Sequence, residues 1–167
     1  SGRAARNGIL IKGGEFLETS AKISAVAVDK TGTLTEGRPQ LTDVIILDST
    51  LDRAEVLRWA AAAEAGSEHP LARPILETAR EEGVAPQGIP GAVTPVPGKG
   101  IMAIITGRQV LIGNPPLLEQ YGVTSGIAEA AQAAQDLAAA GKTPMIVAVD
   151  ETVVGVVAVA DQIRQDA

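Results

Sequence analysis

Short apolar runs along the chain are separated by stretches rich in glycine, proline and polar residues, and the runs predict β-strands. Residues 23–29 consist mainly of Val, Ile and Ala, which predicts a buried strand of the parallel type that ends on Asp29. Residues 30–39 predict a loop, because they hold two glycines, three threonines and a proline. Further strands are predicted at about 41–47, 101–105, 109–113, 144–149 and 153–159, with one more short strand in the proline-rich stretch 84–99.

Apolar positions three and four residues apart predict helices between these strands. Four helices are expected, at about 51–63, 70–82, 115–121 and 125–140. Asp52 or Thr50 is the expected N-cap of the first helix. Ser125 is the expected N-cap of the last helix, and Gly141 follows its end.

The order of these elements predicts an α/β (α+β) fold, in which a mostly antiparallel six-stranded sheet is flanked by helix pairs. Two segments are not assigned to that sheet. The strand at 23–29 and the closing residues 160–167 are assigned to a second domain, into which the sheet domain is inserted.

The composition narrows the possible classes of function. The 167 residues suffice for about one domain, or one domain and a piece of another, and 14 Lys and Arg against 20 Asp and Glu give a net charge of −6. An acidic chain binds nucleic acid and anionic membranes poorly, and only Phe16, Trp59 and Tyr121 are aromatic, which excludes a base-stacking platform. The absence of cysteine excludes disulfides, thiolate metal sites and a cysteine nucleophile. Because no apolar run approaches the ~20 residues of a membrane helix, we expect a soluble, intracellular unit.

The most informative motif is Asp-Lys-Thr-Gly-Thr-Leu-Thr at 29–35. Asp29 stands at the carboxyl end of a predicted strand, where open α/β sheets bind their ligands, and Gly32 lets the backbone approach a phosphate. An aspartate there can attack a phosphoryl group and hold it as an acyl phosphate. Lys30 and the hydroxyls of Thr31 and Thr33 would offset the phosphoryl charge, with Mg²⁺ between Asp29 and the phosphate. A loop that only solvates the strand end is the weaker interpretation for seven consecutive residues of this pattern.

These seven residues resemble the phosphorylation motif of the P-type ATPases, without a mismatch. The resemblance implies that Asp29 is phosphorylated by ATP and that Thr31 offers its backbone carbonyl to the Mg²⁺ at Asp29. Dehalogenase-like phosphatases carry a second aspartate two positions after the nucleophile, as an acid and base for turnover. Thr31 occupies that position, which predicts a longer-lived phosphoenzyme, as a pump requires.

A second motif, Ser-Glu-His-Pro-Leu-Ala at 67–72, lies between the first two predicted helices. Taken alone, His69 before a helix-starting proline is more often a capping or packing residue than a ligand contact. Together with residues 29–35, the motif resembles the signature of the heavy-metal-transporting branch of the P-type ATPases. The resemblance implies that His69 stacks near the adenine of ATP and that Glu64, one turn upstream, hydrogen-bonds the adenine edge.

Glycines near the predicted strands add to this pocket. Gly98 and Gly100 flank Lys99 before the strand at 101–105, and Gly113-Asn114 ends the next strand. A lone Gly-x-Gly is more often a turn than a nucleotide site. These positions resemble the Gly-x-Gly and Gly-Asn pairs of the same family, which implies that the nucleotide lies against the backbone there.

The two ends of the chain resemble further parts of these pumps. Asp-Gln-Ile-Arg at 161–164 resembles the Asp-x-x-Arg at which the pump chain re-enters its phosphorylation domain, and Lys12-Gly13-Gly14 favours the zinc, cadmium and lead subgroup over copper. The implied domains are a linker with the first strand and loop of a haloacid-dehalogenase-like phosphorylation domain, a nucleotide-binding domain and a return segment, at 1–37, 38–159 and 160–167. We expect 1–20 and 161–167 to be frayed or loosely docked.

The resemblance therefore implies an ATP-binding, cytoplasmic fragment of an integral membrane P-type ATPase that exports heavy-metal ions, with copper left open. Its expected cofactors are ATP and Mg²⁺, and its expected partners are ATP and the remaining phosphorylation, actuator and membrane domains of the same polypeptide. The fragment alone is expected only to bind nucleotide. Two alternatives stay open: a stand-alone haloacid-dehalogenase-like phosphatase and a non-catalytic nucleotide-binding module.

Overall fold

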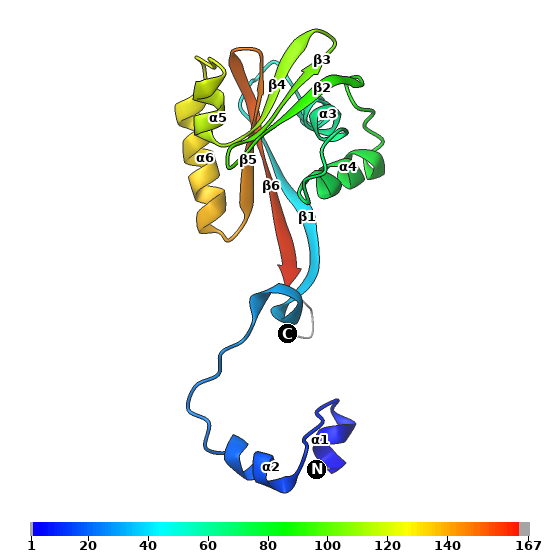
Figure 1. The fold of residues 1–167 in the computed structure, drawn as a ribbon, viewed down its shortest axis with the longest axis vertical. Helices are drawn as coiled ribbons and strands as arrows, with labels where there is room; N and C mark the ends of the chain where they lie inside the picture. Colours follow the sequence, from blue (N-terminus) through cyan, green and yellow to red (C-terminus); the bar gives the residue numbers. More distant parts are fainter. Residues whose placement is uncertain (1, 164–167) are drawn as a thin grey trace.

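A six-stranded sheet forms the centre of the computed structural model, which describes residues 2–163, the side chains of 30 and 31 excepted. Every neighbouring pair of strands is antiparallel, as Figure 1 allows the reader to follow. The predicted mostly antiparallel six-stranded sheet is thus confirmed. In their order across the sheet, the strands are β1 (Thr35–Ile46), β6 (Thr152–Ile163), β5 (Thr143–Val149), β4 (Arg108–Gly113), β3 (Gly100–Ile105) and β2 (Pro90–Val96).

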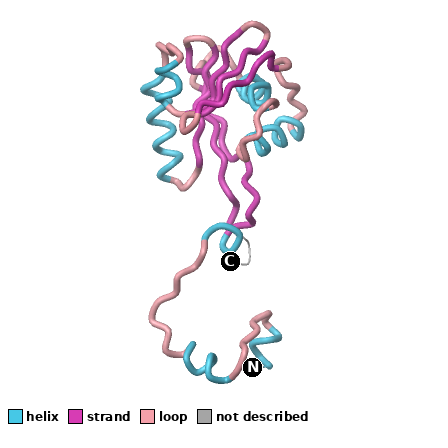
Figure 2. Tube along the Cα trace, in the orientation of Figure 1, coloured by secondary structure: helices cyan, strands magenta, loops and turns pink. Residues whose placement is uncertain are grey.

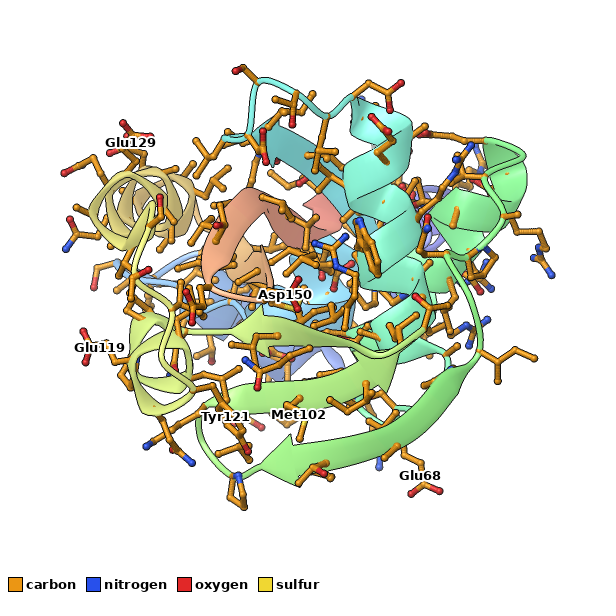
Figure 3. The ribbon with its side chains drawn as sticks, turned by 90° about the horizontal axis from the view of Figure 1, so that it is seen from above. Glu68, Met102, Glu119, Tyr121, Glu129 and Asp150 are labelled. Atoms are coloured by element: carbon orange, nitrogen blue, oxygen red, sulfur yellow. The ribbon has the colours of Figure 1, made fainter. Side chains whose placement is uncertain are left out.

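Two pairs of helices cover the two faces of this sheet (Figure 2). The first pair packs with one apolar cluster, which contains Leu57 and Ile75, and the second pair packs with another, which contains Leu117 and Leu137. Seen from above, Glu119 and Glu129 project from the outer sides of the second pair (Figure 3). The pairs are α3 (Arg53–Glu64) with α4 (Ala72–Glu81), and α5 (Pro115–Gln120) with α6 (Ile127–Ala139).

Side-chain caps explain where two of these helices begin. The Asp52 carboxylate accepts a hydrogen bond from the Glu55 N–H at 2.8 Å, and the Glu55 carboxylate accepts one from the Asp52 N–H at 2.8 Å. This reciprocal pair is a capping box and confirms Asp52 as the N-cap of α3. Asn114 caps α5, because its Oδ1 accepts from the Leu117 N–H at 3.2 Å.

The start of α6 differs from the prediction. Gly126 occupies its N-cap position with φ 86°, and no side chain caps the helix. Ser125 instead forms a parallel bridge with Thr152, and its carbonyl accepts from the Val153 N–H at 3.0 Å. The prediction of Ser125 as N-cap is wrong because the backbone of this residue ties the helix to β6.

Residues 23–29 do not form the predicted buried strand. The chain there has no regular secondary structure, and its apolar side chains are exposed, Val26 to 75%. A strand needs a neighbour for its backbone N–H and C=O groups, whereas the six strands of the described sheet pair only with one another. The predicted loop is also shorter than expected, because a π-helical turn (Lys30–Leu34) leads straight into β1. The short helices before it, α1 (Gly2–Arg6) and α2 (Gly14–Ser20), bury no residue.

The end of β6 is firmly paired, contrary to the expectation of loose docking from residue 161. Asp161 is in register with Pro39 of β1, and its carboxylate accepts from the Thr35 hydroxyl at 2.6 Å and from the Arg38 N–H at 3.0 Å. Residues 161–163 therefore belong to the sheet, while 164–167 lie outside the described residues. Strands β1 and β6 both continue across the expected domain boundaries near 37 and 160, which stay a prediction.

Candidate functional site

A cavity of about 720 Å³ lies between the loop that follows α3 and the turn between β2 and β3. Its volume falls in the range of about 300–1,000 Å³ that is common for small-molecule sites. Four separate segments form its wall, and three of them bring the predicted nucleotide-binding residues together. These residues are Glu64, His69, Gly98, Gly100, Gly113 and Asn114.

Glu64, the last residue of α3, brings a buried carboxylate to this cavity. Its Oε2 has no hydrogen-bond partner among the described residues, although the residue is only 3% exposed. Burial raises the pKa of Glu64, while the neighbouring hydroxyl of Ser67 and the charge of His69 oppose that rise. A buried polar atom without a partner costs about 1–3 kcal/mol, so Oε2 is suited to accept a hydrogen bond from a ligand.

His69 stands on the loop between α3 and α4, and two backbone hydrogen bonds orient it. Its N–H donates to Ser67 Oγ at 3.2 Å, and its Nδ1 accepts from the Leu71 N–H at 3.2 Å. Because Nδ1 is an acceptor, the neutral ring carries its proton on Nε2. The residue is exposed, so a face of the imidazole is available for stacking.

Gly100 and Gly113 face each other where β3 and β4 meet. A Cβ built on Gly100 would lie 2.0 Å from the Ile112 carbonyl oxygen, and one on Gly113 would lie 2.0 Å from the Lys99 carbonyl oxygen. The pairing of the two strands therefore requires glycine at both positions, whatever binds in the cavity. Gly98 differs, because it has φ 72° in the turn and an added Cβ would meet no atom within 4 Å.

Asn114 links the turn before β3 to helix α5. Besides capping that helix, it donates from Nδ2 to the Gly98 carbonyl at 3.0 Å and from its backbone N–H to the Lys99 carbonyl at 2.9 Å. Both ends of the side-chain amide are thus engaged within the protein, so Asn114 shapes the cavity wall by holding the turn. Lys99 places an ammonium group in the same wall, 2.7 Å from Gln120 Oε1.

Several lining residues were missed by the sequence analysis. The start of β5, Thr143–Met145, lies against the cavity although it is far in sequence from the other segments, and no local signal pointed to it. Alternation along β3 could have indicated Ile101, because the inward-facing positions of that strand are buried. The remaining apolar and small lining residues are Gly66, Leu71, Val93, Pro95, Val96, Pro97 and Ile112.

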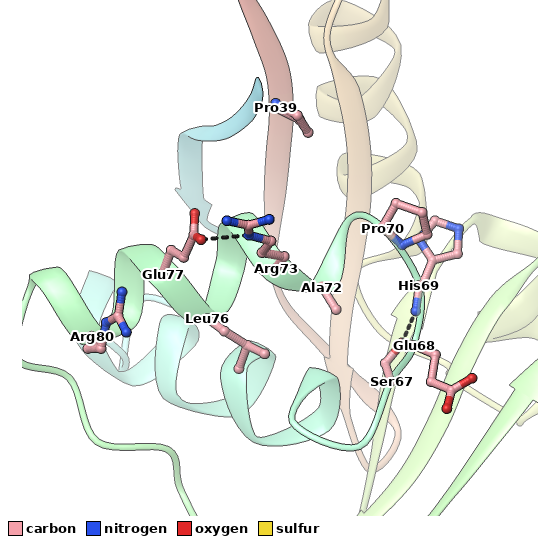
Figure 4. A pocket seen from close by; sticks show the side chains of 10 residues that line it. All are labelled: Pro39, Ser67, Glu68, His69, Pro70, Ala72, Arg73, Leu76, Glu77 and Arg80. Atoms are coloured by element: carbon pink, nitrogen blue, oxygen red, sulfur yellow. Dashed lines mark hydrogen bonds and ion pairs between the residues drawn. The ribbon is translucent and has the colours of Figure 1, made fainter. Parts of the chain in front are cut away.

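A second cavity, of about 670 Å³, lies between α4 and Pro39 of β1 (Figure 4). It shares Ser67, Glu68 and His69 with the first cavity, but neither Glu64 nor any of the predicted glycines lines it. Its Arg73 is paired with Glu77 at 2.7 Å. The larger cavity is therefore the candidate functional site.

The Asp-Lys-Thr-Gly-Thr-Leu-Thr motif at 29–35 lines neither cavity. Asp29, directly before the π-helical turn, and Thr33, inside that turn, are both exposed, and the side chains of Lys30 and Thr31 are outside the described part. Asp29 is the one carboxylate of the motif, and the described residues contain no group of three or more His, Cys, Asp or Glu that could hold a metal ion. The Mg²⁺ site at Asp29 and Thr31 stays a prediction.

Comparisons with known proteins agree with one another. The model of the haloacid dehalogenase-like hydrolase family matches residues 23–167. The copper-exporting P-type ATPase of Bacillus subtilis is 42% identical over 98% of this chain and 20% of that protein, and the probable cadmium-transporting ATPase of Staphylococcus aureus (strain MRSA252) is 38% identical over 98% and 23%. The crystal structure of a zinc-transporting PIB-type ATPase in the E2.Pi state superposes with a TM-score of 0.76 and 35% identity over 98% of this chain and 26% of that one. The chain thus spans about a fifth of these curated relatives, and within its described residues no helix is long and apolar enough to cross a membrane.

Proposed function

Since the chain belongs to the haloacid dehalogenase-like hydrolases and, within them, to the heavy-metal-transporting P-type ATPases, we propose that its sheet domain binds ATP in the cavity of about 720 Å³. One observation carries the proposal. Four segments of the chain converge on a cavity whose wall holds a buried carboxylate oxygen without a partner, Oε2 of Glu64.

The chemistry of the wall suits a purine nucleotide. The exocyclic amino group of adenine is a hydrogen-bond donor, and Oε2 of Glu64 is an acceptor that has no donor among the described residues, so the two can pair. The exposed ring of His69 can stack on the base, and apolar neighbours such as Val93 and Ile101 provide a dry surface for it. Lys99 supplies positive charge toward a triphosphate.

In the longer protein, we propose that this ATP phosphorylates Asp29. A carboxylate oxygen of Asp29 attacks the γ-phosphorus, the bond from that phosphorus to the bridging oxygen breaks, and ADP leaves with the electron pair. Water later hydrolyses the acyl phosphate and releases inorganic phosphate. Bound Mg²⁺ would neutralise phosphate charge. Thr31 supplies no carboxylate for fast hydrolysis, which favours a pump over a phosphatase.

The transfer requires the sheet domain to approach the motif, because Asp29 lies outside the cavity wall. Strands β1 and β6 are the connection between the two, so we propose that this pair carries the hinge (Figure 1). The cytoplasmic location, the export of a heavy-metal ion and the partnership with membrane and actuator domains belong to the same proposal. The preference for zinc, cadmium or lead rests on Lys12-Gly13-Gly14, since relatives named for copper and for cadmium match this chain at 42% and 38% identity.

Calorimetric titration of the 167-residue chain with ATP and GTP tests the proposal. We expect ATP to bind more tightly than GTP and His69→Ala to weaken ATP binding about tenfold. Arg73→Ala is the matched control, because Arg73 lines only the second cavity. Absence of ATP binding, or an effect of Arg73→Ala as large as that of His69→Ala, would overturn the assignment. Hydrolysis of a small phosphate ester by the chain would favour the phosphatase alternative.

A further inference from the structure

Lys99 is the one lysine or arginine among the described residues that line the larger cavity. The residue is half-buried, and its Nζ donates a hydrogen bond to Oε1 of Gln120 at 2.7 Å. Gln120 is the last residue of α5, is exposed, and does not line the cavity. The Lys99 side chain therefore connects the cavity wall to a neutral acceptor outside it.

Three hydrogen bonds hold the backbone of the turn that carries Lys99. The Lys99 N–H donates to the Val96 carbonyl at 3.0 Å, and the Lys99 carbonyl accepts from the Asn114 N–H at 2.9 Å. Asn114 Nδ2 donates to the carbonyl of the preceding residue, Gly98, at 3.0 Å. A change of partner at Nζ then needs only rotation of the side chain, which the flexible four-carbon stem of lysine allows.

The charges of the cavity wall orient a bound nucleotide. Both carboxylates of the described wall come from the α3 side, because Glu64 ends that helix and Glu68 lies on the loop after it. Lys99 belongs to the turn between β2 and β3. Negative phosphates are repelled by the carboxylates and attracted by the ammonium group. A nucleotide with its base at Glu64 and His69 therefore extends its phosphates toward the turn.

We propose that Lys99 recognises the phosphate charge of the nucleotide and that Gln120 competes for its ammonium group: when a nucleotide binds, Nζ exchanges the amide oxygen of Gln120 for a phosphate oxygen. The inference rests on the proposed ATP site and names the residue pair that sets its affinity. The exchange is favourable because a phosphate oxygen carries negative charge and the amide oxygen of glutamine does not. Adenosine has no phosphate, so its binding leaves the pair intact.

Substitutions at the two residues should act in opposite directions. Lys99→Met keeps an apolar stem but removes the charge, and the loss of one charge-assisted hydrogen bond corresponds to about a tenfold loss of ATP affinity. Lys99→Arg keeps the charge and should restore most of that affinity. Gln120→Ala removes the competing acceptor and should raise ATP affinity about threefold. Gln120→Glu should lower it, because a carboxylate holds the ammonium group more strongly than an amide.

The test is calorimetric titration of the 167-residue chain and these variants with ATP and with adenosine, at one fixed Mg²⁺ concentration. We expect all four substitutions to change the ATP/adenosine affinity ratio while the affinity for adenosine stays the same. Gln135→Glu, at an exposed glutamine of α6 outside the cavity wall, adds the same negative charge as Gln120→Glu and is the matched control. In the Lys99→Met background, Gln120→Ala should have no effect, because Gln120 acts through Lys99.

The outcomes separate this inference from the proposed function. If ATP bound the unsubstituted chain and Lys99→Met left its affinity unchanged, or lowered ATP and adenosine affinity equally, the phosphate role of Lys99 would be overturned while the ATP site stood. An equal gain from Gln120→Ala with and without Lys99, or an effect of Gln135→Glu as large as that of Gln120→Glu, would overturn the competition. If the unsubstituted chain bound neither ligand, the proposed function would fail and this inference with it.

Discussion

Gly100→Ala should lower the free energy of unfolding far more than Gly98→Ala. An added Cβ at Gly100 would lie 2.0 Å from the Ile112 carbonyl oxygen and 2.6 Å from the Gly113 Cα, both backbone atoms of the neighbouring strand. Real Cβ atoms essentially never approach closer than 3.0 Å, so the end of the β3–β4 pair must separate. At Gly98 no atom lies within 4 Å of the added Cβ.

The expected magnitudes differ accordingly. Overpacking of this kind costs about 1–3 kcal/mol, and alanine at the Gly100 φ of 140° adds about 1–3 kcal/mol of backbone strain. We expect Gly100→Ala to lower the free energy of unfolding by about 4 kcal/mol, a large part of the 5–15 kcal/mol that is usual for a domain. Gly98→Ala carries only the cost of positive φ, about 1–2 kcal/mol.

Circular dichroism measures both effects, in thermal and in urea unfolding. At about 2–4 °C per kcal/mol for a chain of this size, the thermal midpoint should fall by about 12 °C for Gly100→Ala and about 4 °C for Gly98→Ala. Gly113→Ala should resemble Gly100→Ala, because its Cβ meets the Lys99 carbonyl at 2.0 Å. Equal midpoints for Gly98→Ala and Gly100→Ala would refute the conclusion that strand pairing requires glycine at position 100.

Three further variants test the cavity wall and the pairing of β1 with β6. Burial raises the pKa of Glu64 above its ordinary value of 4.5. Between the pKa in the unfolded chain and the higher pKa in the folded chain, the folded state binds more protons, so the free energy of unfolding falls as pH rises through this window. Glu64→Gln should flatten this pH dependence in urea unfolding and weaken ATP binding in calorimetry. Asn114→Ala should lower the free energy of unfolding by about 1–2 kcal/mol in urea, through the lost helix cap and the lost bond to Gly98, and an unchanged midpoint would contradict the role of Asn114 in holding the turn. Asp161→Ala should cost about 2 kcal/mol and speed hydrogen exchange at the Arg38 amide, and slow exchange there would show that the carboxylate does not hold β1.

Local chemistry predicted most elements of the sheet domain. The Asp52 carboxylate, the Asn114 side chain ahead of two prolines, and the apolar runs of β3 to β6 each act over a few residues, so they could be interpreted without knowledge of the fold. Ser125 has equally good local capping chemistry, yet its backbone pairs with Thr152, a contact made across the fold. Residues 23–29 show the same limit, since an apolar run predicts a strand only where a second strand pairs with it.

The candidate site divides in the same way. Glu64 and His69 were named through their resemblance to a family signature, and the structure places both in one cavity. Thr143–Met145 join that wall only because β5 pairs with β4, an arrangement that the period of apolar residues does not encode. The unpartnered state of Oε2 is likewise a property of packing, which sequence patterns do not describe.

The hydrogen bonds and strand pairing of the cavity wall determine at which residues a substitution tests nucleotide binding without disturbing the fold. Both the Oδ1 and the Nδ2 of Asn114 are hydrogen-bonded within the protein, and the pairing of β3 with β4 requires glycine at positions 100 and 113. Loss of nucleotide binding on replacing any of these three would reflect damage to the fold as much as loss of a contact. Glu64 and His69 retain free capacity, an acceptor oxygen and an exposed ring. Variants at these two residues should therefore weaken nucleotide binding while the chain stays folded, so they distinguish a nucleotide site from a structural cavity.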